Sequence, residues 1–195
     1  MQKSKSKRSC QLPKVSTVSG RSSSITNAFF NAIIPVHAPT VEDELEALAV
    51  LEMSPEEICC AYCGDSHTEW DHLRPIIREK KPTGYITEIA NLVPACGKCN
   101  QSKGGYHWRD WMLGSAPRSP KTRAVADLDR KVMLLERYES WRKPVHIDFD
   151  SVVEPQLWKE HKENWQDVLA LLAKSQTLAK EIRKLVEDAT GRHPS

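Results

Sequence analysis

Four cysteines in two CxxC pairs are the residues of this sequence best suited to bind a metal ion. The pairs are Cys60/Cys63 and Cys96/Cys99. Two thiolates separated by two residues can both reach one Zn²⁺, and two such pairs complete its tetrahedral coordination. The 32 residues between the pairs exceed the interval of about 15–20 that is usual for paired zinc-binding turns. The spacing therefore predicts a zinc site that closes a folded segment.

The two other cysteines fit this site less well. Cys10 lies in a polar segment and is expected to be a free thiol. Cys59 abuts Cys60 and could replace it as a ligand, but only Cys60 has the two-residue spacing to Cys63. We interpret Cys59 as a small buried apolar residue.

Side chains suited to hydrolytic chemistry lie between the cysteine pairs and just after them. They are the adjacent Asp71 and His72, then Asn91, and then Asn100 directly after the last cysteine. A neutral imidazole is a suitable general base near pH 7. Carboxylate and amide oxygens are good ligands for hard divalent cations. Hydrolysis of a phosphodiester needs both functions, because water must be activated and the charge that develops must be neutralised.

This arrangement resembles the HNH endonucleases, whose core is the ββα-metal finger. The resemblance covers residues 60–112, about a quarter of the chain. The matching residues are Cys60, Cys63, Asp71, His72, Asn91, Cys96, Cys99, Asn100 and Lys103.

The resemblance implies a role for each of these positions. His72, at the end of the first strand, would activate water, and Asp71 would ligate a divalent metal ion. Asn91 would fix the loop that orients the histidine. Asn100 stands where the family usually has a metal-ligating histidine on the helix, so the triad is a His-Asn-Asn variant. We therefore expect His72, Asn91 and Asn100 to be the catalytic residues.

Two metals with different roles are implied. Four soft thiolates favour Zn²⁺ as a structural ion. The oxygens of Asp71 and Asn100 favour Mg²⁺ or Mn²⁺ as the catalytic ion. The segment between the cysteine pairs buries too little to hold its long loop without the zinc.

Basic residues beside this site are predicted to bind the substrate. Arg74 and Arg78 follow His72 within the expected loop, and Lys103 follows Asn100 on the expected helix. Contact with phosphate is the predicted role of all three. The alternative for Lys103 is an ordinary solvated charge on a helix.

The fold class predicted is α+β, with a small zinc-clipped ββα-metal nuclease core embedded in a mostly helical chain. Strands are expected over 68–72 and from Asn91, a loop of about eighteen residues between them, and one helix over 100–112. The whole chain divides into a disordered basic arm (1–24), an N-terminal helical segment (25–58), the core (59–113), a linker (114–120) and a C-terminal helical region (121–190).

Charge is distributed unevenly along the chain. The formal net charge is only +2, but residues 1–25 carry +6 and residues 26–58 carry −7. The basic arm could follow a phosphate backbone, or it could be a solvated tail.

The sequence also bounds location and assembly. No apolar region that would mark a signal peptide follows the basic N-terminus, and no apolar run is long enough to span a bilayer, so we expect a cytoplasmic protein without membrane contact. A broad apolar face over residues 157–185 needs a partner, and we predict a homodimer formed through residues 121–188.

These features together predict a metal-dependent endonuclease that acts on DNA, in restriction, phage defence or a mobile element. One alternative is a non-catalytic four-cysteine zinc module that binds nucleic acid. Another is an interaction protein built on the C-terminal helices, which leaves the central motif unexplained.

Overall fold

The computed structural model of the protein describes residues 14–66 and 69–191. The first thirteen residues of the predicted basic arm therefore lie outside the described residues, as do Cys10, His67 and Thr68. The chain divides into two compact units. One unit is Thr26–Lys159, and the other combines Met1–Ile25 with Glu160–Ser195.

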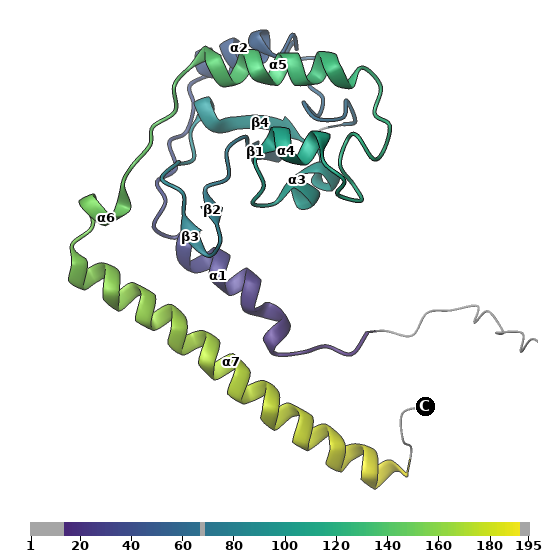
Figure 1. The fold of residues 1–195 in the computed structure, drawn as a ribbon, viewed down its shortest axis with the longest axis vertical. Helices are drawn as coiled ribbons and strands as arrows, with labels where there is room; N and C mark the ends of the chain where they lie inside the picture. The colour runs from purple at the N-terminus through teal and green to yellow at the C-terminus, as the bar shows by residue number, and fades with distance from the viewer. Residues whose placement is uncertain (1–13, 67–68, 192–195) are drawn as a thin grey trace, which may run out of the picture. The chain divides into compact units, whose positions relative to one another are not determined.

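A two-stranded sheet followed by a helix forms the centre of the larger unit. Strand β1 (Glu69–His72) pairs antiparallel with β4 (Leu92–Ala95), and His72 lies opposite Leu92. Helix α3 (Gly97–Lys103) begins directly after β4 (Figure 1). All four residues of β4 are buried. This strand–strand–helix order in a mostly helical chain confirms the predicted α+β class.

Two longer helices pack together beside this sheet. Helix α2 (Val41–Val50) lies against α5 (Leu128–Trp141) (Figure 1). A reciprocal capping box starts α2, because the Thr40 side chain accepts from Asp43 N and the Asp43 carboxylate accepts from Thr40 N. Arg142, just after α5, binds Asp43 at 2.6 Å and Glu46 at 2.9 Å. The two helices are thus joined at one end by an exposed ionic cluster.

The expected single helix over 100–112 is two helices in the structure. Helix α3 ends at Lys103, and α4 (Trp108–Leu113) starts after a turn. Gly104, with φ +49°, ends α3 in a backbone conformation that side chains disfavour. The break lets Trp108, Trp111 and Met112 enter the core.

The expected loop after β1 has internal structure. Strands β2 (Ile77–Arg78) and β3 (Lys81–Pro82) form a hairpin. Its two turn residues, Glu79 and Lys80, have φ of 52° and 61°, as a tight primed turn requires. The 3₁₀ helix η2 (Ile89–Asn91) leads into β4.

The predicted segment boundaries differ from those of the structure in two places. Residues 19–24, which the sequence assigned to the arm, are helical, as η1 (Ser19–Arg21) and the start of α1 (Ser22–Asn31). The predicted linker 114–120 is a packed turn, in which buried Ser119 donates to Gly114 O at 2.9 Å. Helix α5 belongs to the same unit as β1, β4 and α3.

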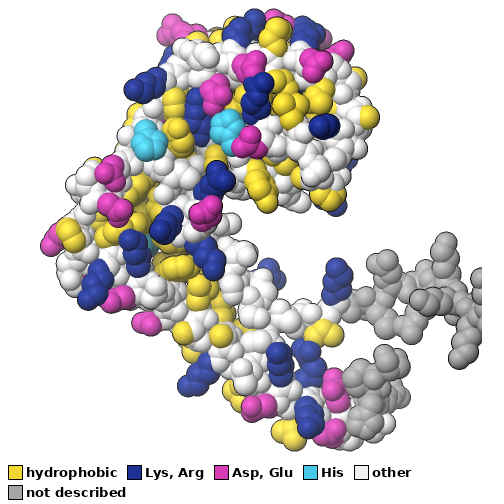
Figure 2. Space-filling view, viewed as in Figure 1, with side chains coloured by type: hydrophobic (Ala, Val, Ile, Leu, Met, Phe, Trp, Pro, Cys, Tyr) yellow, Lys and Arg dark blue, Asp and Glu magenta, His cyan; other side chains and the backbone are white. Residues whose placement is uncertain are grey.

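The smaller unit is built on the long helix α7 (Pro155–Thr190), which follows the short α6 (Phe149–Val152) of the larger unit. Gln176 on α7 is buried and accepts from Val18 N at 2.7 Å and Ser19 N at 3.4 Å. Hydrophobic side chains are exposed among charged ones along α7 (Figure 2). The exposed set includes Leu171, Leu178, Ile182 and Leu185.

The buried hydroxyl of Tyr138 yields a prediction about stability. It lies 2.5 Å from Ile89 O and 2.6 Å from Leu92 O, joining α5 to the start of β4, and the residue is 0% exposed. Tyr138→Phe leaves these carbonyls without that donor, so we expect unfolding free energy to fall by about 1–3 kcal/mol in urea titrations. Tyr106→Phe, at an exposed tyrosine, is the matched control and should change it by less than about 0.5 kcal/mol. Equal stabilities of the two variants would contradict this role of Tyr138.

Candidate active site

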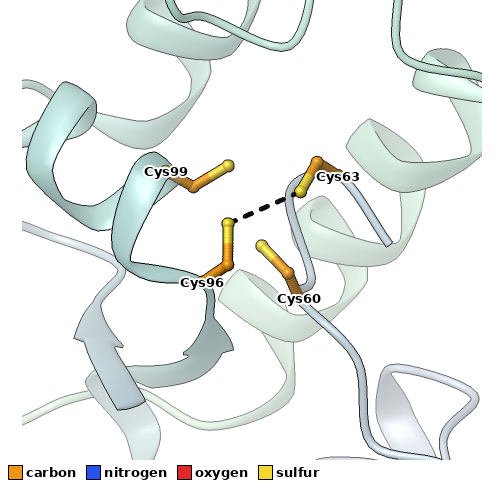
Figure 3. Close-up of side chains that lie close together, drawn as sticks. All are labelled: Cys60, Cys63, Cys96 and Cys99. Atoms are coloured by element: carbon orange, nitrogen blue, oxygen red, sulfur yellow. Dashed lines mark hydrogen bonds between the residues drawn. The ribbon is translucent and has the colours of Figure 1, made fainter. Parts of the chain in front are cut away.

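Four cysteine sulfurs converge on one point next to the sheet. The Sγ atoms of Cys60, Cys63, Cys96 and Cys99 all lie within 4.8 Å of one another. Figure 3 shows the four side chains directed toward a common centre, and the Cys63 and Cys96 sulfurs are 3.7 Å apart. Tetrahedral Zn²⁺ with bonds of about 2.3 Å places its sulfurs about 3.8 Å apart. The four residues therefore fit zinc, and Cys59 is not among them.

The local structure explains how the two pairs meet. Cys60 and Cys63 lie in the turn before β1, while Cys96 is the N-cap residue of α3 and Cys99 lies in its first turn. Ala61 N donates to Pro94 O at 2.8 Å, which brings the first turn onto β4. The antiparallel pairing of β1 with β4 then places both cysteine pairs at the same end of the sheet.

Electrostatics around the sulfurs favour a bound cation. A hydrogen bond with Cys60 and burial raise the pKa of Cys99, and burial raises the pKa of Cys63 to about 11. The hydrogen bond from Cys99 lowers the pKa of Cys60 to about 5. Thiols crowded in this way hold protons that a metal ion displaces. The guanidinium of Arg123 also donates to Cys99 Sγ at 3.1 Å, a contact that offsets thiolate charge.

The residues predicted for hydrolysis line one cleft. It has a volume of about 270 Å³, and its lining includes Asp71, His72, Asn100 and Lys103. Asp71 and His72 come from the end of β1, and Asn100 and Lys103 come from α3. Asn91 is fully buried and belongs to the support of this cleft rather than to its wall.

His72 is held by its ring and by its backbone. Its Nε2 lies 2.8 Å from the Thr87 hydroxyl, and its carbonyl accepts from Lys103 Nζ at 2.7 Å. Burial, followed by the charge of Lys103, lowers the pKa of His72 to about 4. The imidazole is therefore neutral at pH 7, which is the form that a general base needs. Thr87 carries no sequence signal that could have identified it.

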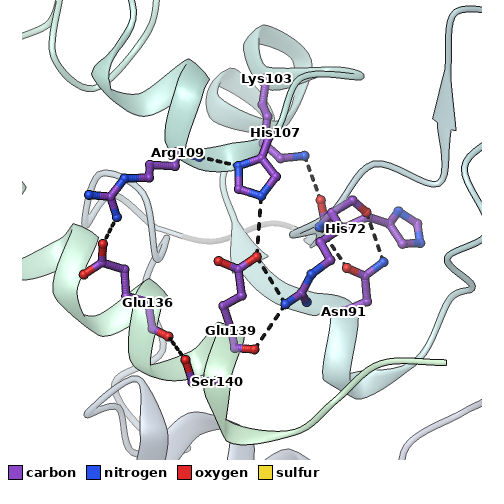
Figure 4. A network of polar contacts seen from close by, with 9 residues as sticks. His72, Asn91, Lys103, His107, Arg109, Glu136, Glu139 and Ser140 are labelled. Carbon is purple, nitrogen blue, oxygen red and sulfur yellow. Dashed lines mark hydrogen bonds and ion pairs between the residues drawn. The ribbon is translucent and has the colours of Figure 1, made fainter. Parts of the chain in front are cut away.

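Asn91 fixes the start of the segment that follows His72. Its Oδ1 accepts from Arg74 N at 2.8 Å, and its Nδ2 donates to Arg74 O at 3.0 Å. Figure 4 shows Asn91 beside His72. An amide that satisfies both backbone groups of one residue holds the chain as a strand partner would. This is the geometry that fixing the loop requires.

Asp71 is the centre of a buried polar cluster. Its carboxylate accepts from the Tyr62 hydroxyl at 2.7 Å, and Lys103 Nζ lies 3.3 Å from Oδ1 and 3.1 Å from Oδ2. Burial raises the pKa of Asp71 and lowers that of Lys103, while their opposite charges act against both shifts. Tyr62, which sequence reasoning missed, stands between the two cysteines of the first pair.

The donor set of the cleft fits a hard divalent cation. Asp71 and Asn100 line the same cleft, and their oxygens are of the type that Mg²⁺ and Mn²⁺ prefer. A carboxylate accepts more hydrogen bonds or ligands than the two partners that Asp71 has here. In the structure Lys103 neutralises the Asp71 carboxylate, so a bound cation would share this carboxylate with Lys103.

The three predicted substrate-binding residues differ in their surroundings. Lys103 is 1% exposed and engaged by Asp71, so it is not a solvated helix charge. The Arg74 side chain is 12% exposed and pairs with Glu139 of α5 at 3.1 Å, so contact with phosphate stays a prediction for it. His107 contacts the same Glu139 carboxylate at 3.5 Å (Figure 4). Arg78 is 57% exposed and lies 3.8 Å from Glu79, so contact with phosphate stays a prediction for it.

Comparison with known proteins agrees with the resemblance. The model of the HNH endonuclease family matches residues 60–105, which include all four cysteines and every residue of the cleft that β1 and α3 supply. No curated protein and no solved structure shows significant similarity to the chain.

The convergence of the sulfurs yields a prediction about zinc. We expect one Zn²⁺ per chain by elemental analysis. Cys96→Ser should lose the metal and lower the melting temperature by at least about 10 °C. Several kcal/mol of metal-binding free energy are lost, and each kcal/mol corresponds to about 2–4 °C in a chain of this size.

Cys59→Ser is the matched control, because Cys59 adjoins the site without belonging to the sulfur cluster. It should keep one Zn²⁺. A chelated, metal-free protein with an unchanged melting temperature would contradict a structural role for zinc.

Proposed function

We propose that this protein is a metal-dependent HNH endonuclease that hydrolyses phosphodiester bonds in DNA. The observation that carries the proposal is one cleft lined by a neutral histidine together with carboxylate and amide oxygens, His72, Asp71 and Asn100. These side chains lie within the segment that matches the HNH endonuclease family. The combination of a general base and a hard-cation ligand set is what hydrolysis of a phosphodiester demands.

Each residue has a defined task in this proposal. His72 takes the proton of the attacking water, and Thr87 keeps its ring in place through the 2.8 Å contact. Asn91 holds the backbone that follows His72. A bound Mg²⁺ or Mn²⁺, ligated by Asp71 and Asn100, supplies charge neutralisation at the phosphate and at the leaving oxygen.

Location and assembly belong to the same proposal. The reducing cytoplasm keeps the four thiols available to zinc. Among the helices of residues 14–66 and 69–191, none is long and apolar enough to cross a membrane. The exposed leucines of α7 support a homodimer, which would present two cleavage sites to the two strands of a duplex. Restriction, phage defence and mobile-element transfer all suit such an enzyme.

One observation favours a second candidate function. Lys103 already neutralises the Asp71 carboxylate, so the cleft has no uncompensated acid to attract a cation. A zinc-stabilised module that binds nucleic acid without cutting it would need nothing more. Such a module does not explain why His72 is held neutral at the cleft.

Plasmid cleavage separates these functions. With Mg²⁺ or Mn²⁺, the protein should nick or linearise supercoiled DNA, and His72→Ala should lower the rate by about 10²–10⁴ because it removes the general base. His37→Ala, at an exposed histidine, is the control and should keep the rate. Because the pKa of His72 is lowered to about 4, the imidazole remains unprotonated well below pH 6.5. Loss of activity through protonation of His72 should therefore begin only as the pH approaches this lowered pKa.

Two results would contradict the nuclease proposal. DNA binding without cleavage by the zinc-loaded protein would favour the non-catalytic module. Undiminished cleavage by His72→Ala would show that His72 is not the general base. The zinc content and melting temperature of each variant show whether it is folded.

A further inference from the structure

Two asparagines of α1 line the same cleft as the hydrolytic residues. Asn27 and Asn31 belong to the lining of this cleft but lie outside the family match, because that match begins at Cys60. They are four residues apart, so both lie on one face of the helix. Both are exposed. The cleft thus has a wall that the HNH segment does not supply.

Backbone hydrogen bonds attach the chain after α1 to the catalytic side of the cleft. Thr87 N donates to Pro35 O at 3.1 Å, and His37 N donates to Thr87 O at 2.8 Å. Thr87 is also the residue whose hydroxyl lies 2.8 Å from the His72 ring. The exit of α1 and the orientation of His72 therefore depend on one residue. Residues 27–87 all belong to the unit Thr26–Lys159.

The chemistry of this wall differs from that of the catalytic side. Residues 22–36 contain no Asp, Glu, Lys or Arg, so α1 brings no charge to a phosphate. A carboxamide offers one acceptor and two donors in a plane. That pattern matches the edge of a nucleic-acid base, as in the paired hydrogen bonds of asparagine with adenine. Contacts with phosphate, in contrast, come mainly from basic side chains.

We propose that Asn27 and Asn31 hydrogen-bond a base next to the scissile phosphate and set the base preference of the cut. The inference rests on the proposed nuclease function and adds the element that selects its substrate. His72, Asp71 and Asn100 act on the phosphate, while α1 reads the nucleotide beside it. Specificity and chemistry then come from different segments of the chain.

Cleavage of a random DNA pool, followed by sequencing of the new ends, tests this division. The wild-type protein should show a base preference within a few nucleotides of the cut. The double variant Asn27→Ala, Asn31→Ala should still cut, with that preference lowered at least about fivefold, since a paired amide–base contact discriminates by this factor or more. Alanine is favourable in a helix, so α1 should keep its structure.

Asn164→Ala, at an exposed asparagine of α7, is the matched control and should leave the distribution of cuts unchanged. The two single variants are measured as well, so that a folding defect of the double variant does not decide the result. An unchanged distribution in all α1 variants contradicts the inference, and so does a uniform loss of rate with the same base preference. A wild-type protein that cuts without any preference beside the cut also contradicts it, whereas one that cuts no DNA overturns the nuclease proposal itself.

Discussion

The convergence of four thiols at one end of a small sheet is the constraint on which the rest of the site depends. β1 and β4 pair over only four residues each, and a two-stranded sheet of this size is marginal by itself. The sulfur cluster joins the turn before β1 to the residues after β4, so a metal there would hold the two strands together at that end of the sheet. Tyr62, between the first two cysteines, then holds Asp71 in place. The cysteine cluster and the carboxylate of the cleft are thus connected through one side chain.

Charge within the cleft is balanced before any ion or substrate binds. Lys103 lies at the buried carboxylate of Asp71 and also holds the carbonyl of His72. A buried carboxylate without a partner would be costly, and the ammonium offsets part of that cost. The same ammonium helps to keep the neighbouring imidazole neutral. Lys103 therefore contacts both Asp71 and His72 at the cleft, and its contact with phosphate stays a prediction.

Spacing and residue type were sufficient to predict the parts of the site that are local in sequence. The four clustered cysteines follow from two CxxC pairs, and the cleft residues of β1 and α3 follow from the motif around them. Residues whose contacts are set by the tertiary fold left no such pattern. Thr87 reaches His72, Arg123 reaches Cys99 and Arg74 reaches Glu139 across 15 to 65 positions. The break of the expected helix at Gly104 was also missed, although the Gly104-Gly105 pair is a helix-ending signal in the sequence. The asparagines of α1 could be assigned to the cleft only once the chain was folded.

The central claim is that this chain binds two metals for two purposes, and anomalous diffraction from crystals grown with Zn²⁺ and Mn²⁺ tests it most directly. Data collected at both absorption edges should place zinc among the four sulfurs and manganese at the oxygens of Asp71 and Asn100, with Lys103 no longer the sole cation at Asp71. Zinc alone, with Lys103 still paired to Asp71 at a saturating Mn²⁺ concentration, would contradict the account.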